Sequence, residues 1–198
     1  MKVIGITGGI GAGKSAVLDF LQRNYKARII QADLVGHHLM EPGNATYYPI
    51  VEQFGSQILN GDMTINRQKL GVIVRKNFEK WEQLNRIVHP RVKEYVVGEI
   101  KAAEEAGMDY LFVEAALLIE DHYDAICDEL WYIYAGEELR RERLKKVRGY
   151  TEEKISQIFE RQLKDAEFRR HCRVVIDKSG NLEDTFRQIR KELYTWKR

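Results

Sequence analysis

Five short apolar segments recur along the chain, and each has the length and composition of a buried strand. They are residues 2–7, 28–30, 110–113, 130–134 and 173–177. Isoleucine, valine, leucine and aromatic residues dominate them, as is typical of strands covered on both faces. Between them, apolar residues recur mostly at helical spacing. This alternation predicts an α/β fold with a parallel five-stranded sheet and helices on both faces.

The stretch between the second and third predicted strands is much longer than the others. Residues 35–107 have an almost entirely helical pattern, too long for a simple crossover, and we expect an inserted helical subdomain there. Within it, Pro90 is predicted to occupy the first turn of a helix, where its missing N–H would be unpaired anyway, and this helix should end near Gly107. The core that contains the sheet would then comprise residues 1–34, 108–136 and 172–198.

A strongly charged helical segment precedes the last strand. Residues 137–148 form a helical pattern that Gly149 should end, and Thr151 and Asn181 can cap the two helices that follow. The segment contains a dense run of cations, at Arg140, Arg141, Arg143, Lys145, Lys146 and Arg148. Such a run is most often a solvated helix face.

Composition and charge exclude several classes of protein. Among the 198 residues, 44% are hydrophobic and 31% are charged, and the net charge is only +2. There is no broad basic field for nucleic acid, no apolar run long enough to span a membrane and no pattern of a signal peptide. The two cysteines, Cys127 and Cys172, form neither a disulfide framework nor a zinc motif. We therefore expect a cytoplasmic protein without nucleic-acid or membrane partners, and assign the cysteines no role.

The strongest motif lies between the first strand and the helix that follows it. Residues 8–15 read Gly-Gly-Ile-Gly-Ala-Gly-Lys-Ser and fit the phosphate-binding pattern G-x-x-x-x-G-K-[ST] in its required strand–loop–helix context. Glycines let successive N–H groups point inward to a phosphate at the positive end of a helix. The dinucleotide pattern G-x-G-x-x-G fails, because Lys14 stands where glycine is needed. The expected nucleotide-binding residues are Gly8, Gly9, Gly11, Ala12, Gly13, Lys14, Ser15 and Ala16.

Two side chains of this loop have chemistry suited to a magnesium-bound nucleoside triphosphate. Lys14 supplies a compact positive charge to the β- and γ-phosphates, and the Ser15 hydroxyl is a hard oxygen ligand for Mg²⁺. The motif alone leaves open phosphoryl transfer to a small molecule, hydrolysis that drives a switch or motor, and transfer to a protein. The N-K-x-D motif of small GTPases is absent from the sequence.

Five spaced segments together resemble the dephospho-CoA kinase family over essentially the whole chain. They are residues 6–15, 32–33, 84–92, 113–118 and 174–182. The resemblance implies a P-loop kinase fold similar to nucleoside monophosphate kinases, with an acceptor-binding helical insertion at 35–107 and a mobile lid at 137–171. It also implies MgATP as donor and the ribose 3′-hydroxyl of dephospho-CoA as acceptor, and we expect a monomer. The sequence departs from the family at Ala16, where Thr is usual, at Ala116, where Pro is frequent, and by one extra residue within 145–148.

Asp33 directly follows the second predicted strand, at the edge of the sheet where ligands bind in open α/β folds. On its residues alone, Asp33 could be an ordinary helix N-cap. The family resemblance implies instead that it binds the acceptor hydroxyl and takes up its proton.

Other site residues rest largely on the same resemblance. Glu114 ends a strand and is expected to hold a water bound to Mg²⁺, with a solvated strand-end charge as the alternative. Arg143 and Arg148 are the lid residues expected to reach the phosphates, and Arg161 and Gln162 are candidates to join them. His89 is expected to contact the acceptor. Two other functions stay open: a related P-loop kinase for a nucleoside or another metabolite, and a non-catalytic nucleotide-binding regulator.

Overall fold

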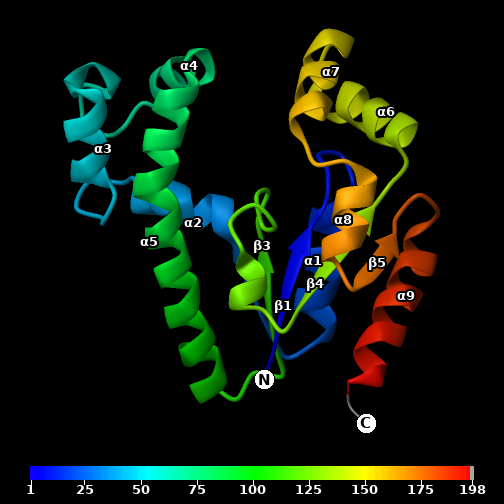
Figure 1. Cartoon of the computed structure of the whole chain (residues 1–198). Coiled ribbons are helices and arrows are strands. Elements are labelled where there is room, and N and C mark those ends of the chain that lie inside the picture. Colours follow the sequence, from blue (N-terminus) through cyan, green and yellow to red (C-terminus); the bar gives the residue numbers. More distant parts are fainter. Residues whose placement is uncertain (197–198) are drawn as a thin grey trace. The chain divides into compact units, whose positions relative to one another are not determined.

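The computed structural model of the protein describes residues 1–196 and contains a central five-stranded sheet (Figure 1). Its strands lie in the order β2-β3-β1-β4-β5. Their bounds are β1 Lys2–Thr7, β2 Ala27–Gln31, β3 Tyr110–Glu114, β4 Glu129–Tyr134 and β5 Val174–Asp177. Strand β1 pairs in parallel with β3 and β4, and β4 pairs in parallel with β5. The predicted α/β fold is confirmed.

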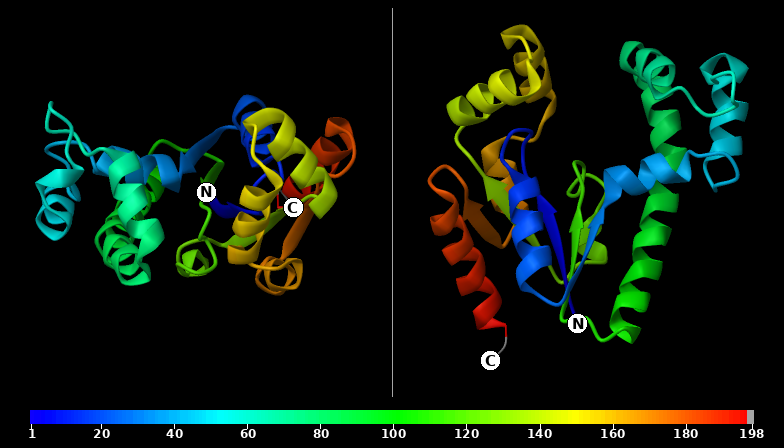
Figure 2. Two further views of the ribbon diagram at one scale, coloured as in Figure 1. Left: turned by 90° about the horizontal axis from the view of Figure 1, so that it is seen from above. Right: turned by 180° about the vertical axis from the view of Figure 1, so that it is seen from behind.

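Side chains of β4 alternate between two buried layers, because successive residues of a strand point to opposite faces. Trp131 and Ile133 join a core that includes residues of α1 (Lys14–Asn24) and α9 (Leu182–Thr195). Tyr132 points the other way and stacks on Phe168, with 4.6 Å between ring centroids. Phe168 belongs to α8 (Asp165–His171), so helices cover both faces of the sheet, as predicted (Figure 2).

The chain divides into two compact units. The first contains residues 1–29 and 103–196 and therefore holds most of the sheet. The second runs from Ile30 to Ala102. It holds α2 (Ala32–Leu39), α3 (Tyr47–Phe54), the short helix η1 (Ser56–Ile58), α4 (Arg67–Lys76) and most of α5 (Phe78–Glu105). The sequence places the helical insertion at 35–107, and its role as an acceptor-binding domain stays a prediction.

The predicted helix start at Pro90 is wrong. Helix α5 is continuous through this residue. Proline removes one backbone hydrogen bond and favours a kink, but Val88, Val92 and Val96 form a buried stripe that spans the position. Burial of a side chain of this size is worth about 1.5–3 kcal/mol, so the stripe offsets the lost hydrogen bond and keeps the helix intact.

Two further helices of the first unit pack together ahead of α8. Leu144 of α6 (Glu137–Arg148) lies in a small buried cluster with Ile155 and Phe159 of α7 (Glu152–Arg161). Gly149 ends α6 in the left-handed conformation with φ 62°. Both predicted caps are confirmed: the Thr151 side chain accepts from the Lys154 N–H, and the Asn181 side chain accepts from the Asp184 N–H. The remaining element is the short helix η2 (Tyr123–Ala125).

No helix within residues 1–196 has both the length and the apolar composition that a membrane span requires.

Both cysteines should be nearly inert in the folded protein. Cys127 and Cys172 are buried, and burial raises the pKa of each thiol to about 12. Since only the thiolate reacts, we expect modification by a disulfide reagent at pH 8 to be about a thousandfold slower than in the unfolded chain. Absorbance of the released thiol measures both rates. Two thiols that react within seconds under native conditions would contradict this assignment.

Candidate active site

The loop between β1 and α1 curls tightly because three of its glycines have positive φ, and all three are packed against neighbouring atoms. A methyl group at Gly8 would lie 2.4 Å from the backbone oxygen of Ile133, and one at Gly13 would lie 2.8 Å from a side-chain carbon of Lys178. Gly13 is the N-cap of α1, and no side chain caps that end. The Ala16 N–H donates to the Gly13 carbonyl, and the N–H groups of Lys14 and Ser15 remain available to a phosphate.

Lys14 extends back across the loop that it follows. Its Nζ donates to the Gly8 carbonyl at 2.8 Å and lies 3.4 Å from Oε1 of Glu114. Glu114 ends β3, and the register that pairs it with Ile6 places it beside the end of β1. The Glu114 side chain is only 11% exposed. A buried carboxylate is costly unless it is paired, so the Lys14 ammonium stabilises Glu114 at this position.

The oxygen atoms available here fit a magnesium ion that arrives with a nucleotide. Ser15 supplies a hydroxyl in the first turn of α1, and Glu114 supplies a carboxylate. Residues 1–196 contain no cluster of three or more His, Cys, Asp or Glu side chains that could hold a metal. Mg²⁺ is commonly bound by one or two protein oxygens together with phosphates and water, and this donor set suits that mode.

Arg143 of α6 binds the backbone carbonyls of the phosphate loop. Its Nη1 donates to the carbonyls of Gly11, at 3.3 Å, and Ala12, at 3.2 Å. Its Nη2 donates to the carbonyl of Lys178 at 3.0 Å. The guanidinium therefore links the phosphate loop to the turn between β5 and α9. Lys178 is itself buried, and burial together with the Arg143 charge lowers the pKa of its ammonium group.

Arg140 reaches the loop as well, although no sequence pattern distinguishes it from the other cations of its run. A methyl group at Gly9 would collide with its Nη1. The guanidinium lies over the Phe159 ring, 4.3 Å from the centroid, and its Nε is buried without a hydrogen-bond partner among the described residues. Gln162 accepts from Arg140 Nη1 at 3.4 Å and from the Ile10 N–H at 3.3 Å. The structure thus brings Arg140 and Gln162 together at the loop.

Arg148 has a different environment. It is exposed at the C-terminal end of α6. Three other cations of the run are engaged in surface ion pairs: Arg141 with Glu137 and Glu152, Lys145 with Glu152, and Lys146 with Glu142. The structure therefore brings Arg140 and Arg143 to the phosphate loop, and leaves Arg148 in solvent.

Asp33 lies in the second unit and is exposed in the first turn of α2. The N-cap of this helix is Gln31. The alternative of Asp33 as an N-cap is therefore wrong, although a carboxylate in the first turn still interacts favourably with the helix dipole. His89 is half-buried within α5 of the same unit.

Comparisons with known proteins agree with this arrangement. A family described as dephospho-CoA kinase matches residues 2–184. The chain is 36% identical over 197 residues to a dephospho-CoA kinase of Carboxydothermus hydrogenoformans, covering 100% of this chain and 95% of that one. It is 35% identical over 188 residues to one of Listeria monocytogenes, covering 95% and 94%. Among solved structures, TT1252 from Thermus thermophilus is similar with a TM-score of 0.83 and 25% identity, over 98% of this chain and 97% of that one.

The tight packing around Gly8 should make the loop intolerant of even a methyl group. We expect Gly8→Ala to lower the free energy of unfolding by at least about 2 kcal/mol, because the backbone is strained at φ 147° and the methyl group meets a carbonyl oxygen. Denaturant unfolding followed by tryptophan fluorescence measures this change. Gly136→Ala is the matched control, since a methyl group there meets nothing within 4 Å, and its effect should stay below about 1 kcal/mol. Equal effects of the two substitutions would show that the close approach at Gly8 is unimportant.

Proposed function

Since the chain belongs to the dephospho-CoA kinase family, we propose that it transfers the γ-phosphoryl group of ATP to the ribose 3′-hydroxyl of dephospho-CoA, giving coenzyme A and ADP. The observation that carries the proposal is the pairing of a phosphate-binding loop with Lys14 and the buried Glu114 at the ends of β1 and β3. Family membership across nearly the whole chain supports the identity of the acceptor.

Lys14 has the charge and position required for the terminal phosphates. Its Nζ lies over the loop, and N–H groups of the same loop would surround the β-phosphate. Transfer of a phosphoryl group is catalysed mainly by positioning and by stabilising charge on the phosphate oxygens. On nucleotide binding, the ammonium would exchange its contact with Glu114 for the β- and γ-oxygens.

Magnesium, when bound, would neutralise charge on the phosphate oxygens. Ser15 would hold it directly, and Glu114 would hold it through a water molecule, which matches the preference of Mg²⁺ for keeping part of its hydration shell. Release of Lys14 from Glu114 would leave the carboxylate available for that role.

Asp33 is proposed to bind the acceptor. Its carboxylate accepts a hydrogen bond from the 3′-hydroxyl and takes the proton as the oxygen bonds to the γ-phosphorus. The bond between that phosphorus and the bridging oxygen breaks, and ADP leaves with the electron pair. Because the transition state is loose, orientation of the hydroxyl contributes more than removal of its proton. His89, in the same unit, remains a proposed acceptor contact.

Among the lid arginines, we propose different roles for the two that were expected to be catalytic. Within residues 1–196, Arg143 donates to backbone carbonyls alone, so it acts by holding the loop in its binding shape. Arg148 is exposed, and a direct role would require α6 to move. Arg140 is better placed to reach a phosphate, because its guanidinium already lies against Gly9. Cytoplasmic location and a monomeric state stay predictions.

The reaction itself is tested by asking whether ADP formation depends on the acceptor. The purified protein with MgATP should release ADP rapidly with dephospho-CoA, and at least about 100-fold more slowly with adenosine or with no acceptor. A coupled assay for ADP and mass spectrometry of the nucleotide product measure both. ADP release that does not depend on dephospho-CoA would favour the alternative of a nucleotide-binding regulator. Faster turnover of a nucleoside would favour the alternative of a related P-loop kinase.

Asp33→Asn should lower kcat by about 100-fold or more, because the neutral amide, although similar in size, is a weaker hydrogen-bond acceptor that orients the hydroxyl less well and takes up no proton. KM for ATP should change less than about threefold, since ATP binds to the other unit. Steady-state kinetics with each substrate varied in turn give both constants. Glu52→Gln, another exposed acidic residue of the second unit, is the control and should behave as wild type. A loss confined to ATP affinity would exclude the proposed role.

A further inference from the structure

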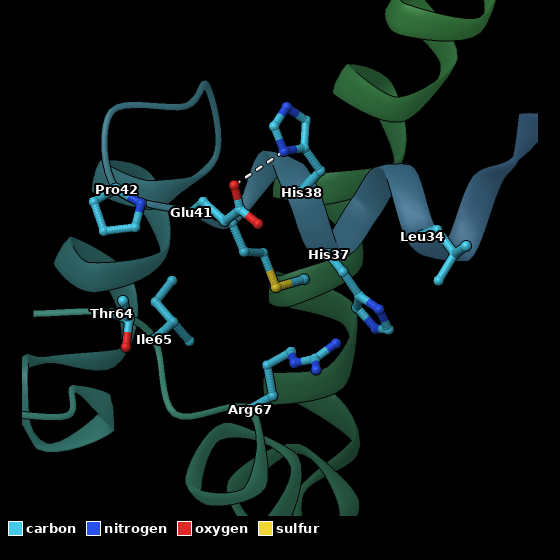
Figure 3. Close-up of a pocket in the computed structure, with 9 residues that line it drawn as sticks. Leu34, His37, His38, Glu41, Pro42, Thr64, Ile65 and Arg67 are labelled. Carbon is cyan, nitrogen blue, oxygen red and sulfur yellow. Dashed lines mark hydrogen bonds and ion pairs between the residues drawn. The ribbon is translucent and has the colours of Figure 1, made fainter.

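Cationic side chains gather in a pocket of the second unit, but acids balance their charge there. The pocket has a volume of about 360 Å³ (Figure 3). Within it, Glu41 pairs with His38, whose Nδ1 lies 3.0 Å from the carboxylate. His37 is under the opposing influences of the Arg67 guanidinium and the Asp33 carboxylate. The pocket therefore has no surplus of positive charge.

The turn after β5, in the first unit, presents a cation that no acid balances. Lys178 is only 8% exposed, and its ammonium forms neither an ion pair nor a hydrogen bond with any group of residues 1–196. Asp177, its neighbour in the chain, accepts from the Ser179 N–H instead. Burial and the Arg143 charge both lower the pKa of Lys178. A buried charge without a partner is costly, so an anion beside this ammonium would stabilise it.

The end of the Lys178 side chain lies against the phosphate loop. A methyl group at Gly13 would lie 2.8 Å from its Cε and 3.3 Å from its Nζ. Gly13 is the N-cap of α1, and the positive end of a helix attracts anions. The Arg143 guanidinium is also close, since its Nη2 donates to the Lys178 carbonyl. Two cationic side chains and a helix end thus bring positive charge to the same part of the loop.

The ammonium groups of Lys14 and Lys178 belong to opposite sides of β1. In the sheet, β3 lies on one side of β1, and β4 followed by β5 lies on the other. Lys14 Nζ is beside Glu114 at the end of β3, whereas Lys178 directly follows β5. A triphosphate on the loop, with its reacting end at Lys14, would therefore direct its α-phosphate toward Lys178. Ala16, in the first turn of α1, has no side-chain donor for that phosphate.

We propose that the Lys178 ammonium binds a non-bridging oxygen of the α-phosphate of the donor nucleotide. The inference rests on the proposed function for the identity of the donor, and it adds a binding residue from the turn after β5. Lys14 then serves the reacting phosphates, and Lys178 serves a phosphate that stays with ADP. Because Lys178 does not contact the reacting phosphorus, it contributes to the affinity for ATP and ADP alike and not to the chemical step.

Lys178→Met tests this assignment, because methionine keeps an apolar stem against Gly13 and removes the charge. Calorimetry should give a Kd for ADP about 10- to 100-fold higher than in the wild type, as expected for loss of a charged hydrogen bond. KM for ATP should rise by a similar factor, while kcat at saturating ATP should change less than about threefold. Lys191→Gln removes an exposed lysine of α9 and should leave all three constants unchanged.

Sulfur-substituted ADP tests whether the contact is at the α-phosphate. In the two diastereomers of ADPαS, one or the other non-bridging α-oxygen is replaced by sulfur, which is a poorer hydrogen-bond acceptor. Without added magnesium, the wild type should bind one diastereomer at least about fivefold more weakly than the other, and this ratio should fall at least about threefold in Lys178→Met. Calorimetry with each diastereomer measures the four values of Kd.

The outcomes separate this contact from the reaction and from the fold. A wild-type protein that binds ADP but does not phosphorylate dephospho-CoA overturns the proposed function, and the Kd values alone then decide the contact. An unchanged Kd for ADP in Lys178→Met, or an unchanged ratio between the diastereomers, overturns the contact. The free energy of unfolding should stay equal or rise in Lys178→Met, because the variant removes an unpaired buried charge. A fall in denaturant unfolding that accounts for the weaker binding would show that Lys178 acts on the fold instead.

Discussion

The contact between Arg143 and the backbone carbonyls of residues 8–15 is the constraint on which the nucleotide site depends. A loop that directs its N–H groups toward a ligand must direct carbonyls elsewhere, and these need donors of their own. Arg143 supplies donors to two of them and to the carbonyl of Lys178. One guanidinium thereby ties together the loop after β1, the turn after β5 and helix α6. The shape that a phosphate requires is thus built into the fold of the first unit.

This preorganisation lowers the stability of the fold, because it requires charged groups to be buried near the loop. Lys178 is buried beside Arg143, and both burial and that charge lower the pKa of its ammonium group. Glu114 is buried and has Lys14 as its cationic partner. Groups of this kind are poor contributors to stability, and like charges held close together are readily compensated by an anion. An incoming polyphosphate would supply that negative charge, so these buried cations favour its binding.

The two units divide the chemistry between them. The first contains the phosphate loop, Ser15, Glu114 and α6, whereas Asp33 and His89 belong to the second. Under the proposed function, donor and acceptor are recognised by separate sets of residues, so a generic phosphate loop can serve a specific acceptor. The proposal assigns the donor to the P-loop motif and the selection of the acceptor to the helical second unit.

Local sequence determined the strands, the caps at Thr151 and Asn181 and the phosphate loop, because each depends on residues that are neighbours in the chain. The loop was predictable in particular because positions such as Gly13 have positive φ, which glycine adopts without strain. Tertiary structure decided what depends on distant partners. Buried valines on one face keep α5 continuous through Pro90. Arg140 and Arg143 contact the loop although about 130 residues of sequence separate them from it. The run contains six cations at similar spacing, and no local pattern distinguishes the two that reach the loop. The packing of α6 beside the loop selects them.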